Sequence, residues 1–153
     1  MTDIIDSVKK RLADCVYDAI GGYVSTNWNI SVVKSSELPV STIKFEPITL
    51  VDETYCGSQS KSTWMYVDFS IVVFSEVDRT GDPSVPINYT GMDYVDSVVD
   101  KLLEISDSNT EQDSYRIADI FDIQVTERSF NRRNRNRGVY GFTISGRMRV
   151  EWN

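Results

Sequence analysis

Two stretches of the chain carry apolar residues at the three- and four-residue steps of an amphipathic helix. In residues 3–20 the apolar positions fall on one stripe, made by Ile5, Val8, Leu12, Cys15, Val16 and Ala19. Gly21-Gly22 follows at once, and glycine tolerates the left-handed backbone that ends many helices. In residues 92–105 the apolar face consists of Tyr94, Val95, Val98, Val99 and Leu102. The spacing predicts two helices, with Cys15 as a small core residue and not a nucleophile.

Alternation of apolar and polar residues predicts strands at residues 28–33, 40–50 and 63–75. In the second of these Ile43 and Phe45 share a face, and Pro47 favours an edge position or a bend. The third is expected to be the central strand, because its apolar face is joined by a second face that is also partly apolar. The first face holds Met65, Val67, Phe69, Ile71 and Val73, and the other holds Trp64, Tyr66, Val72 and Phe74. Polar or Pro/Gly-containing connections are expected at residues 52–62, 76–90 and 106–116.

The last third of the chain predicts a long β-hairpin. In its first arm Phe121, Ile123 and Val125 alternate with polar residues. In its return arm the residues on one face are Tyr140, Phe142, Ile144, Met148, Val150 and Trp152. A period of two over a dozen residues is typical of a half-buried strand. The whole pattern predicts one α+β domain over residues 1–153, with two helices packed on one face of a mainly antiparallel sheet and a long C-terminal β-hairpin.

The composition excludes several kinds of catalytic and metal site but says little about the fold. The chain has 153 residues, two cysteines and no histidine. The missing histidine excludes Ser-His-Asp and Cys-His catalysis and histidine-based metal sites, and the pair of cysteines is too few for a structural zinc site. The acidic clusters do not match a calcium loop, and no glycine-rich phosphate loop is present. We therefore expect no enzyme, no cofactor and no metal. Short apolar runs predict no membrane span, and the N-terminus lacks the apolar core of a signal peptide.

Charge is distributed very unevenly along the sequence. The segment from Arg128 to Arg149 contains seven arginines and no acidic residue, in a chain of net charge −7. Five of these arginines surround the predicted polar turn of the hairpin at residues 131–138: Arg128, Arg132, Arg133, Arg135 and Arg137. They fit three interpretations: a grip on nucleic-acid phosphate, a dock for an acidic protein surface such as an identical neighbour, or a solvated turn. The excess of acids elsewhere disfavours a dedicated nucleic-acid binder.

The strand at residues 63–75 also predicts self-association. If the helices cover only one face of the sheet, the apolar residues of the other face need a different cover. Trp64, Tyr66 and Phe74 are therefore the candidate oligomer interface. The edge of the sheet formed by the long hairpin offers a second contact, since a neighbour can complete it.

Several of these elements, in this order, resemble the tail terminator (tail completion or head–tail joining) proteins of long-tailed bacteriophages. The similarity lies in the N-terminal amphipathic helix ending at Gly21-Gly22, the strand WMYVDFSIVVF at 64–74, the helix YVDSVVDKLL at 94–103 and the return arm RGVYGFTI at 137–144. The arginine-rich turn followed by a Gly-aromatic-Gly-aromatic strand is the nearest point of similarity. These elements span most of the chain, and none of them is diagnostic alone.

The resemblance implies a structural virion protein of the tail or neck, made in the host cytoplasm, that assembles into a homo-oligomeric ring, usually a hexamer. Such a ring caps the tail tube protein, ends tube polymerisation and joins the tail to the head–tail connector protein, with only transient contact to DNA in the lumen. Arg132, Arg133, Arg135 and Arg137 would then face an acidic partner ring or the lumen. The alternatives are another phage neck, head-completion or tube component, or a small adaptor that binds nucleic acid through the arginine-rich turn.

Overall fold

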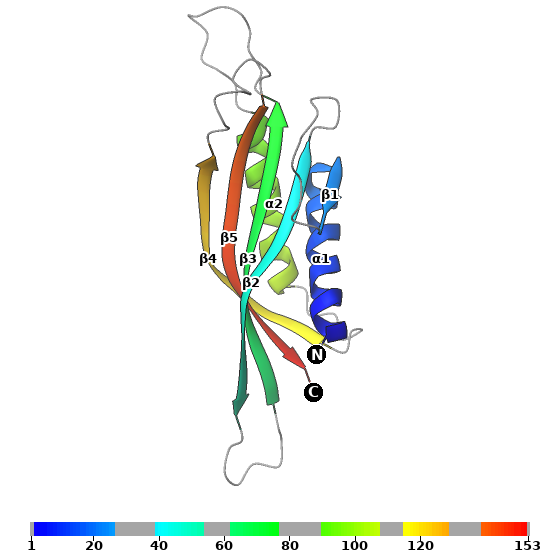
Figure 1. The fold of residues 1–153 in the computed structure, drawn as a ribbon, viewed down its shortest axis with the longest axis vertical. Coiled ribbons are helices and arrows are strands. Elements are labelled where there is room, and N and C mark those ends of the chain that lie inside the picture. The colour runs from blue at the N-terminus through cyan, green and yellow to red at the C-terminus, as the bar shows by residue number, and fades with distance from the viewer. Residues whose placement is uncertain are drawn as a thin grey trace, which may run out of the picture.

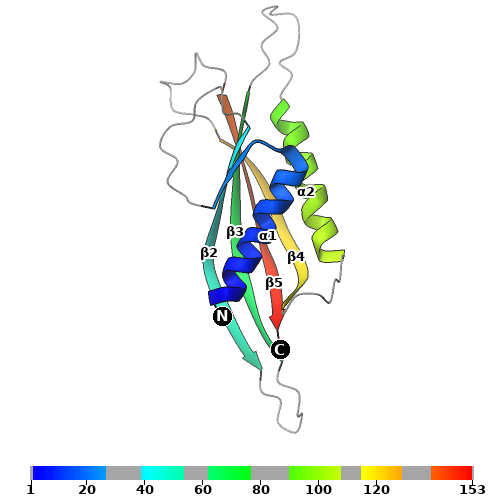
Figure 2. The same cartoon turned by 90° about the vertical axis from the view of Figure 1, so that its right-hand side faces the viewer.

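The computed structural model describes residues 2–26, 39–53, 62–76, 90–107, 115–128 and 139–152. The elements in chain order are α1 (Thr2–Ile20), β1 (Tyr23–Ser25), β2 (Val40–Glu53), β3 (Ser62–Glu76), α2 (Thr90–Asp107), β4 (Tyr115–Arg128) and β5 (Val139–Trp152). Both helices lie against the same face of one long sheet (Figures 1 and 2). This confirms the predicted α+β class, with its two helices, its mainly antiparallel sheet and its C-terminal hairpin. The strand predicted at 28–33 and the turn at 131–138 lie outside the described residues.

The sheet has five strands in the order β1-β2-β3-β5-β4. β3 lies at its centre, as its apolar character on both faces predicts, between β2 and β5 and antiparallel to both. β4 and β5 form the long hairpin. Only β1 runs parallel to its neighbour, pairing with the first three residues of β2. The free edges of the sheet are therefore β4 on one side and most of β2 on the other.

α1 ends as the two glycines predict. Gly21 and Gly22 have φ angles of 67° and 74°, and the Gly21 N–H donates to the carbonyl oxygen of Tyr17 at 2.7 Å. The left-handed turn reverses the chain into β1, where the N–H of Tyr23 donates to the Pro39 carbonyl. The cap thus places β1 beside β2 directly after the helix.

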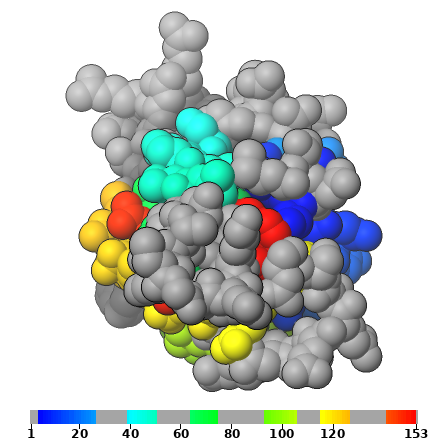
Figure 3. All heavy atoms as spheres, turned by 90° about the horizontal axis from the view of Figure 1, so that it is seen from below, coloured from blue at the N-terminus to red at the C-terminus, as the bar shows by residue number. Residues whose placement is uncertain are grey.

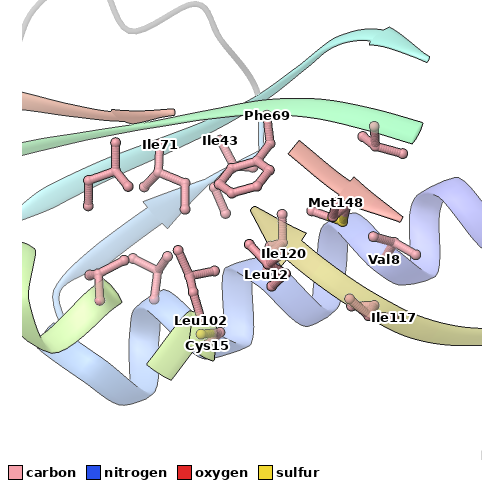
Figure 4. Packing of buried hydrophobic residues seen from close by; sticks show 14 of the residues in the cluster. Val8, Leu12, Cys15, Ile43, Phe69, Ile71, Leu102, Ile117, Ile120 and Met148 are labelled. Atoms are coloured by element: carbon pink, nitrogen blue, oxygen red, sulfur yellow. The ribbon is translucent and has the colours of Figure 1, made fainter. Parts of the chain in front are cut away.

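One core joins the helices to the sheet. Figure 4 shows Ile43, Phe69 and Ile71 directed from the sheet toward Leu12 and Cys15 of α1, with Leu102 of α2 beside them. The apolar stripes predicted for the helices supply this layer: Val8, Leu12, Cys15, Val16, Val95, Val98 and Leu102 are all buried. Cys15 is a free thiol in this core. Apolar burial of this extent is the main stabilising contribution in a domain of this size.

The first arm of the hairpin departs from the simple alternation predicted for it. β4 changes register twice against β5, between Ile117 and Asp119 and between Phe121 and Gln124, and Asp122 has a φ of 55°. Each shift inserts an unpaired residue, which moves the following side chains to the other face. As a result Phe121 lies opposite Arg147, on the face away from the helices, while Val125 lies opposite Ile144 on the helix side. The prediction that Phe121, Ile123 and Val125 share one face is therefore wrong.

Two boundaries also differ from the sequence-based expectation. β4 begins at Tyr115, within the segment predicted as a loop at 106–116, and the Tyr115 hydroxyl reaches the Ser7 carbonyl of α1 at 3.4 Å. β2 continues to Glu53 after a register shift between Phe45 and Ile48, which confirms the bend expected at Pro47. The shift keeps Ile48 and Leu50 on the helix side of the sheet.

The lower part of the sheet extends past the helices. β2 and β3 run beyond α1 at the end where both termini lie (Figure 1), and atoms of β2, β4 and α1 all reach the surface in the view from below (Figure 3). Ile48 and Leu50 are 36% and 51% exposed here, although they lie on the helix side. On the helix side, β2 is therefore left partly uncovered at this level, whereas its partners Met65 and Val67 on β3 stay buried in the core.

Candidate interaction surface on the open face of the sheet

The face of the sheet opposite the helices carries most of the features that bear on function. The register of the strands aligns its side chains in rows across β2, β3, β5 and β4. The middle rows hold Asp68, Arg147 and Phe121, then Lys44, Ser70, Ser145 and Gln124. The rows nearer the termini hold Tyr66, Arg149 and Asp119, then Trp64, Glu151 and Arg116. We refer to this surface as the open face.

Asp68 and Arg147 form the best-defined ion pair of the open face. Arg147 donates from Nε to Oδ1 of Asp68 at 2.6 Å and from Nη2 to Oδ2 at 3.3 Å. These residues are direct partners on β3 and β5, so the sheet itself aligns the two parallel hydrogen bonds. The hydrogen bond that Arg147 donates to Asp68, together with the charge of Asp68, raises the pKa of Arg147 above its ordinary value. Arg147 is therefore held in place by two hydrogen bonds in the middle of this surface.

Arg149, which lies nearer the termini than Arg147, packs against an aromatic side chain. The Arg149 guanidinium lies 4.8 Å from the centroid of the Trp64 ring and its Nη2 is 2.6 Å from Oε1 of Glu151. Tyr66 meets Phe121 edge-to-face at a centroid separation of 6.2 Å. Stacking on an indole and pairing with a carboxylate restrict the arginine to one conformation. This part of the open face is consequently a preorganised surface and not a flexible charged one.

A shallow depression lies in the middle of the open face. It has a volume of about 240 Å³ and is lined on one side by Glu46, Asp68 and Ser70 and on the other by Asp122, Gln124 and Ser145, with Arg147 and Gly146 between them. Two serines and a glycine are among its lining residues. The bulge of β4 turns Asp122 into this depression, because its left-handed backbone interrupts the alternation of the strand.

The open face is close to neutral. Its described side chains include four bases, Lys44, Arg116, Arg147 and Arg149, and five acids, Glu46, Asp68, Asp119, Asp122 and Glu151. The strand register sets Asp68 opposite Arg147, Asp119 opposite Arg149 and Glu151 opposite Arg116. Such a surface has no excess positive charge with which to attract a phosphate backbone.

Unpartnered polar groups concentrate on this face. Within the described residues, four buried side-chain polar atoms have no hydrogen-bond partner: Ser41 Oγ, Trp64 Nε1, Thr143 Oγ1 and Arg149 Nε. The last three belong to the open face, since Thr143 lies opposite Val72 and the other two form the stacked pair. Buried polar groups normally find a partner, and each one left without costs about 1–3 kcal/mol. Because these atoms are already buried in the single chain, they reflect close packing on this side of the sheet.

The residues predicted as an oligomer interface all lie on the open face, but they expose less apolar surface than expected. Trp64 and Phe74 are only 9% and 8% exposed in a single chain, and Val72 is 1% exposed. Tyr66 is half-buried and packs on Phe121. Any contact made by this surface therefore depends mainly on Tyr66, Phe121 and the polar rows between them. The prediction of an interface at Trp64, Tyr66 and Phe74 itself stays a prediction.

The arginines singled out by the sequence fall into two groups. Arg128 ends β4 and pairs in register with Gly141, whereas Arg132, Arg133, Arg135 and Arg137 lie outside the described residues. The structure adds Arg147 and Arg149, which the sequence places on the polar side of β5 without partners. Asp68 lies 79 residues before its partner Arg147, and Trp64, which stacks on Arg149, lies on the same strand as Asp68, so only the strand register reveals these partners.

The described parts of the chain give little support for a metal site, a reactive thiol or a membrane-spanning helix. No group of three or more histidine, cysteine, aspartate or glutamate side chains is arranged there to hold a metal ion. Burial raises the pKa of the Cys15 thiol from 9.0 to about 12, so that thiol stays protonated and is a poor nucleophile at neutral pH. Among the helices of the structure, none is long and apolar enough to cross a membrane.

Comparison with known protein families and with curated proteins found no match. The sequence matches no protein-family model, and no curated protein is significantly similar to it.

Proposed function

We propose that the protein is a structural subunit of a ring that caps a bacteriophage tail tube, ends tube polymerisation and joins the tail to the head connector. The proposal comes from the resemblance of the sequence to tail terminator proteins. It is supported by the α+β architecture, which has the helix, central strand, helix and long hairpin in the order that the resemblance implies. It makes the protein a virion component without catalytic activity.

The observation that carries the proposal is the open face of the sheet. A surface with aligned ion pairs, a stacked tryptophan–arginine pair and an edge-to-face tyrosine–phenylalanine pair fits a subunit contact, because arginine and aromatic residues are enriched in such contacts. The two free edges, β4 and most of β2, lie on opposite sides of the sheet. Two different contact surfaces on one chain suit the head-to-tail interfaces that close into rings.

The charge distribution favours a protein partner over nucleic acid. The open face is nearly neutral, and neither helix has a basic residue in its last turn. A nucleic-acid-binding adaptor would need a basic stripe, which in this chain only the arginine-rich segment supplies. In the assembled ring, an acidic body would let DNA pass through the lumen without binding it.

Light scattering of the purified protein over a range of concentrations and salt tests the proposal. We expect a discrete ring of about six subunits, alone or on addition of tail tube protein, whose stability falls less steeply with salt than the affinity of DNA binding does. A strict monomer in both conditions that binds DNA with steeply salt-dependent affinity would instead support the adaptor function.

A further inference from the structure

We infer that the depression on the open face receives an arginine from the segment between β4 and β5 of a second copy of this chain. The inference rests on the proposed function, because it names the contact that would join copies into a ring. The site consists only of described residues: Glu46, Asp68, Ser70, Asp122, Gln124, Ser145 and Arg147.

The chemistry of the depression matches a guanidinium group. Its rim holds three carboxylates, and its walls add the amide of Gln124 and the hydroxyls of Ser70 and Ser145. Its one cation, Arg147, is already bound to Asp68 through both oxygens, which orients it away from any incoming acid. Glu46 is shared with Lys44 at 3.5 Å, and both of these side chains are more than 40% exposed. An arginine brings five donors in a planar fork, which suits several acceptors around one hollow.

Asp122 is the feature that distinguishes this hollow from an ordinary charged surface. It is the one non-glycine residue with positive φ in the described chain, and it lies in a bulge of β4 that lines the depression. Aspartate and asparagine tolerate this backbone better than other residues, so a charge is not needed for the turn itself. The charge at this position is therefore available for a partner.

The sequence supplies the complementary group in excess. Residues 128–138 contain five arginines and no acid, in a chain that is otherwise strongly acidic. This segment begins at Arg128 and returns at Val139, at the far end of the hairpin from the termini. Charge complementarity thus identifies one segment of the chain as the occupant.

Head-to-tail packing in the proposed ring supplies a second copy as the donor. In such an interface one surface of a subunit contacts a different surface of its neighbour, so the arginine-rich segment of one copy meets the depression of the next.

A peptide-binding experiment tests the contact directly. The receptor is the full chain with Arg132→Ser, Arg133→Ser, Arg135→Ser and Arg137→Ser, so that its own arginines cannot compete. The probe is a synthetic peptide of residues 128–138, titrated by calorimetry, with a peptide carrying the same four serines as its control. Adding Glu46→Gln and Asp122→Asn to the receptor is expected to weaken binding at least about tenfold, because both changes remove charge and keep shape. Asparagine also keeps the left-handed backbone at position 122.

Asp96→Asn with Asp100→Asn is the matched control. It removes the same charge from the exposed side of α2, and we expect it to change the affinity by less than about twofold. The inference would be overturned if the peptide showed no saturable binding, or if the Glu46/Asp122 variant and the Asp96/Asp100 control lost affinity equally. Unfolding curves of each receptor establish that the variants are folded.

Light scattering of the wild-type chain separates this inference from the proposed function. If the wild-type chain forms rings but the Glu46→Gln and Asp122→Asn changes do not weaken peptide binding, the proposed contact is wrong and the proposed ring is unaffected. A wild-type chain that stays monomeric far above the peptide dissociation constant, both alone and with tail tube protein, would overturn both, because the segment would then not join two copies.

Discussion

The ring of Phe69 occupies the space above Gly146, its direct partner across β3 and β5. A Cβ atom added at Gly146 would come within 2.8 Å of Phe69 Cζ, a distance that real Cβ contacts do not show. Phe69 is the largest of the side chains that are fully buried in the described core. The glycine is therefore required by packing, since its own backbone does not have a positive φ.

Gly146→Ala is expected to destabilise the fold by about 1–3 kcal/mol, as overpacked cores usually do. Chemical denaturation with the neighbouring Ser145→Ala as control measures the effect, because Ser145 points to the open face. Combining Gly146→Ala with Phe69→Leu should recover part of the loss, since the smaller side chain leaves room for the methyl group. No recovery would show that the two residues do not compete for this space.

The two glycines after α1 should respond differently to alanine. Both have positive φ, so each substitution costs about 1–2 kcal/mol through the backbone. At Gly21 the added Cβ meets nothing within 4 Å, whereas at Gly22 it would lie 2.1 Å from the Pro39 carbonyl oxygen. Gly22→Ala should therefore lower the unfolding midpoint clearly more than Gly21→Ala. Equal effects would mean that the contact with Pro39 relaxes without cost.

Leu102 and Leu103 are adjacent on α2 but differ completely in burial. Leu102 is fully buried in the core, and Leu103 is 45% exposed. Leu102→Ala should cost about 2–5 kcal/mol through lost burial and the cavity left behind. Leu103→Ala should fall within the range of ordinary surface changes, about 0.5 kcal/mol. A denaturant titration of both variants measures the two losses in the free energy of unfolding. Similar losses would mean that α2 presents a different face to the core.

The Cys15 thiol should react with thiol reagents only when the protein unfolds. In a Cys56→Ser background, a colorimetric thiol reagent at pH 8 should label the native protein far more slowly than the denatured one. The folded state holds the Cys15 proton up to a pKa of about 12, while the unfolded state releases it near 9.0. This contribution to stability is thus complete below pH 9 and is lost as the pH rises toward 12.

Comparison with Cys15→Ala isolates that contribution. The stability difference between the Cys15 protein and the alanine variant should shrink between pH 9 and 12, because only the former has this thiol. A constant difference across that range, or rapid labelling of the native protein, would contradict the buried placement.

Replacing Arg132, Arg133, Arg135 and Arg137 by serine should leave folding intact but impair assembly. Circular dichroism and the unfolding midpoint are expected to match the wild type, since surface substitutions usually have small effects. Light scattering should show smaller species than the wild type. Four serines at polar positions elsewhere on the exposed helix surface, replacing Asp6, Lys10, Asp14 and Asp18, provide a control with unchanged hairpin charge. Loss of the folded state would mean that the arginines contribute to the core.

The sequence was sufficient for the elements whose pattern is regular. The alternation from Tyr140 to Trp152 and the helical stripe around Leu12 and Leu102 correctly identify the buried faces, because each position repeats one constraint from the same core. In β4 the two register shifts break the period, so Phe121 appears on the wrong face. β1 is only three residues long and depends on the turn at Gly21-Gly22, which gives it no periodicity of its own.

The open face was the harder part to predict. Its polarity is evident from Arg147 and Arg149, but the partner of Arg147 is set by the pairing of two strands that lie far apart in the sequence. The depression depends on a glycine, two serines and a bulge that converge from three strands, and none of these residues is unusual alone. Pairwise register is a property of the sheet, which a single pattern of apolar residues does not encode.

The position of β5 between β3 and β4 has a consequence for synthesis on the ribosome. β3 ends at Glu76, yet its long partner strand begins only at Val139. Until that strand has been made, one side of the most apolar strand of the sheet has no partner to hydrogen-bond. The pairing of β3 with β5 can therefore form only after the last strand has been synthesised. Chains truncated before β5 should be bound by chaperones or degraded by proteases, and should not be incorporated into an assembly.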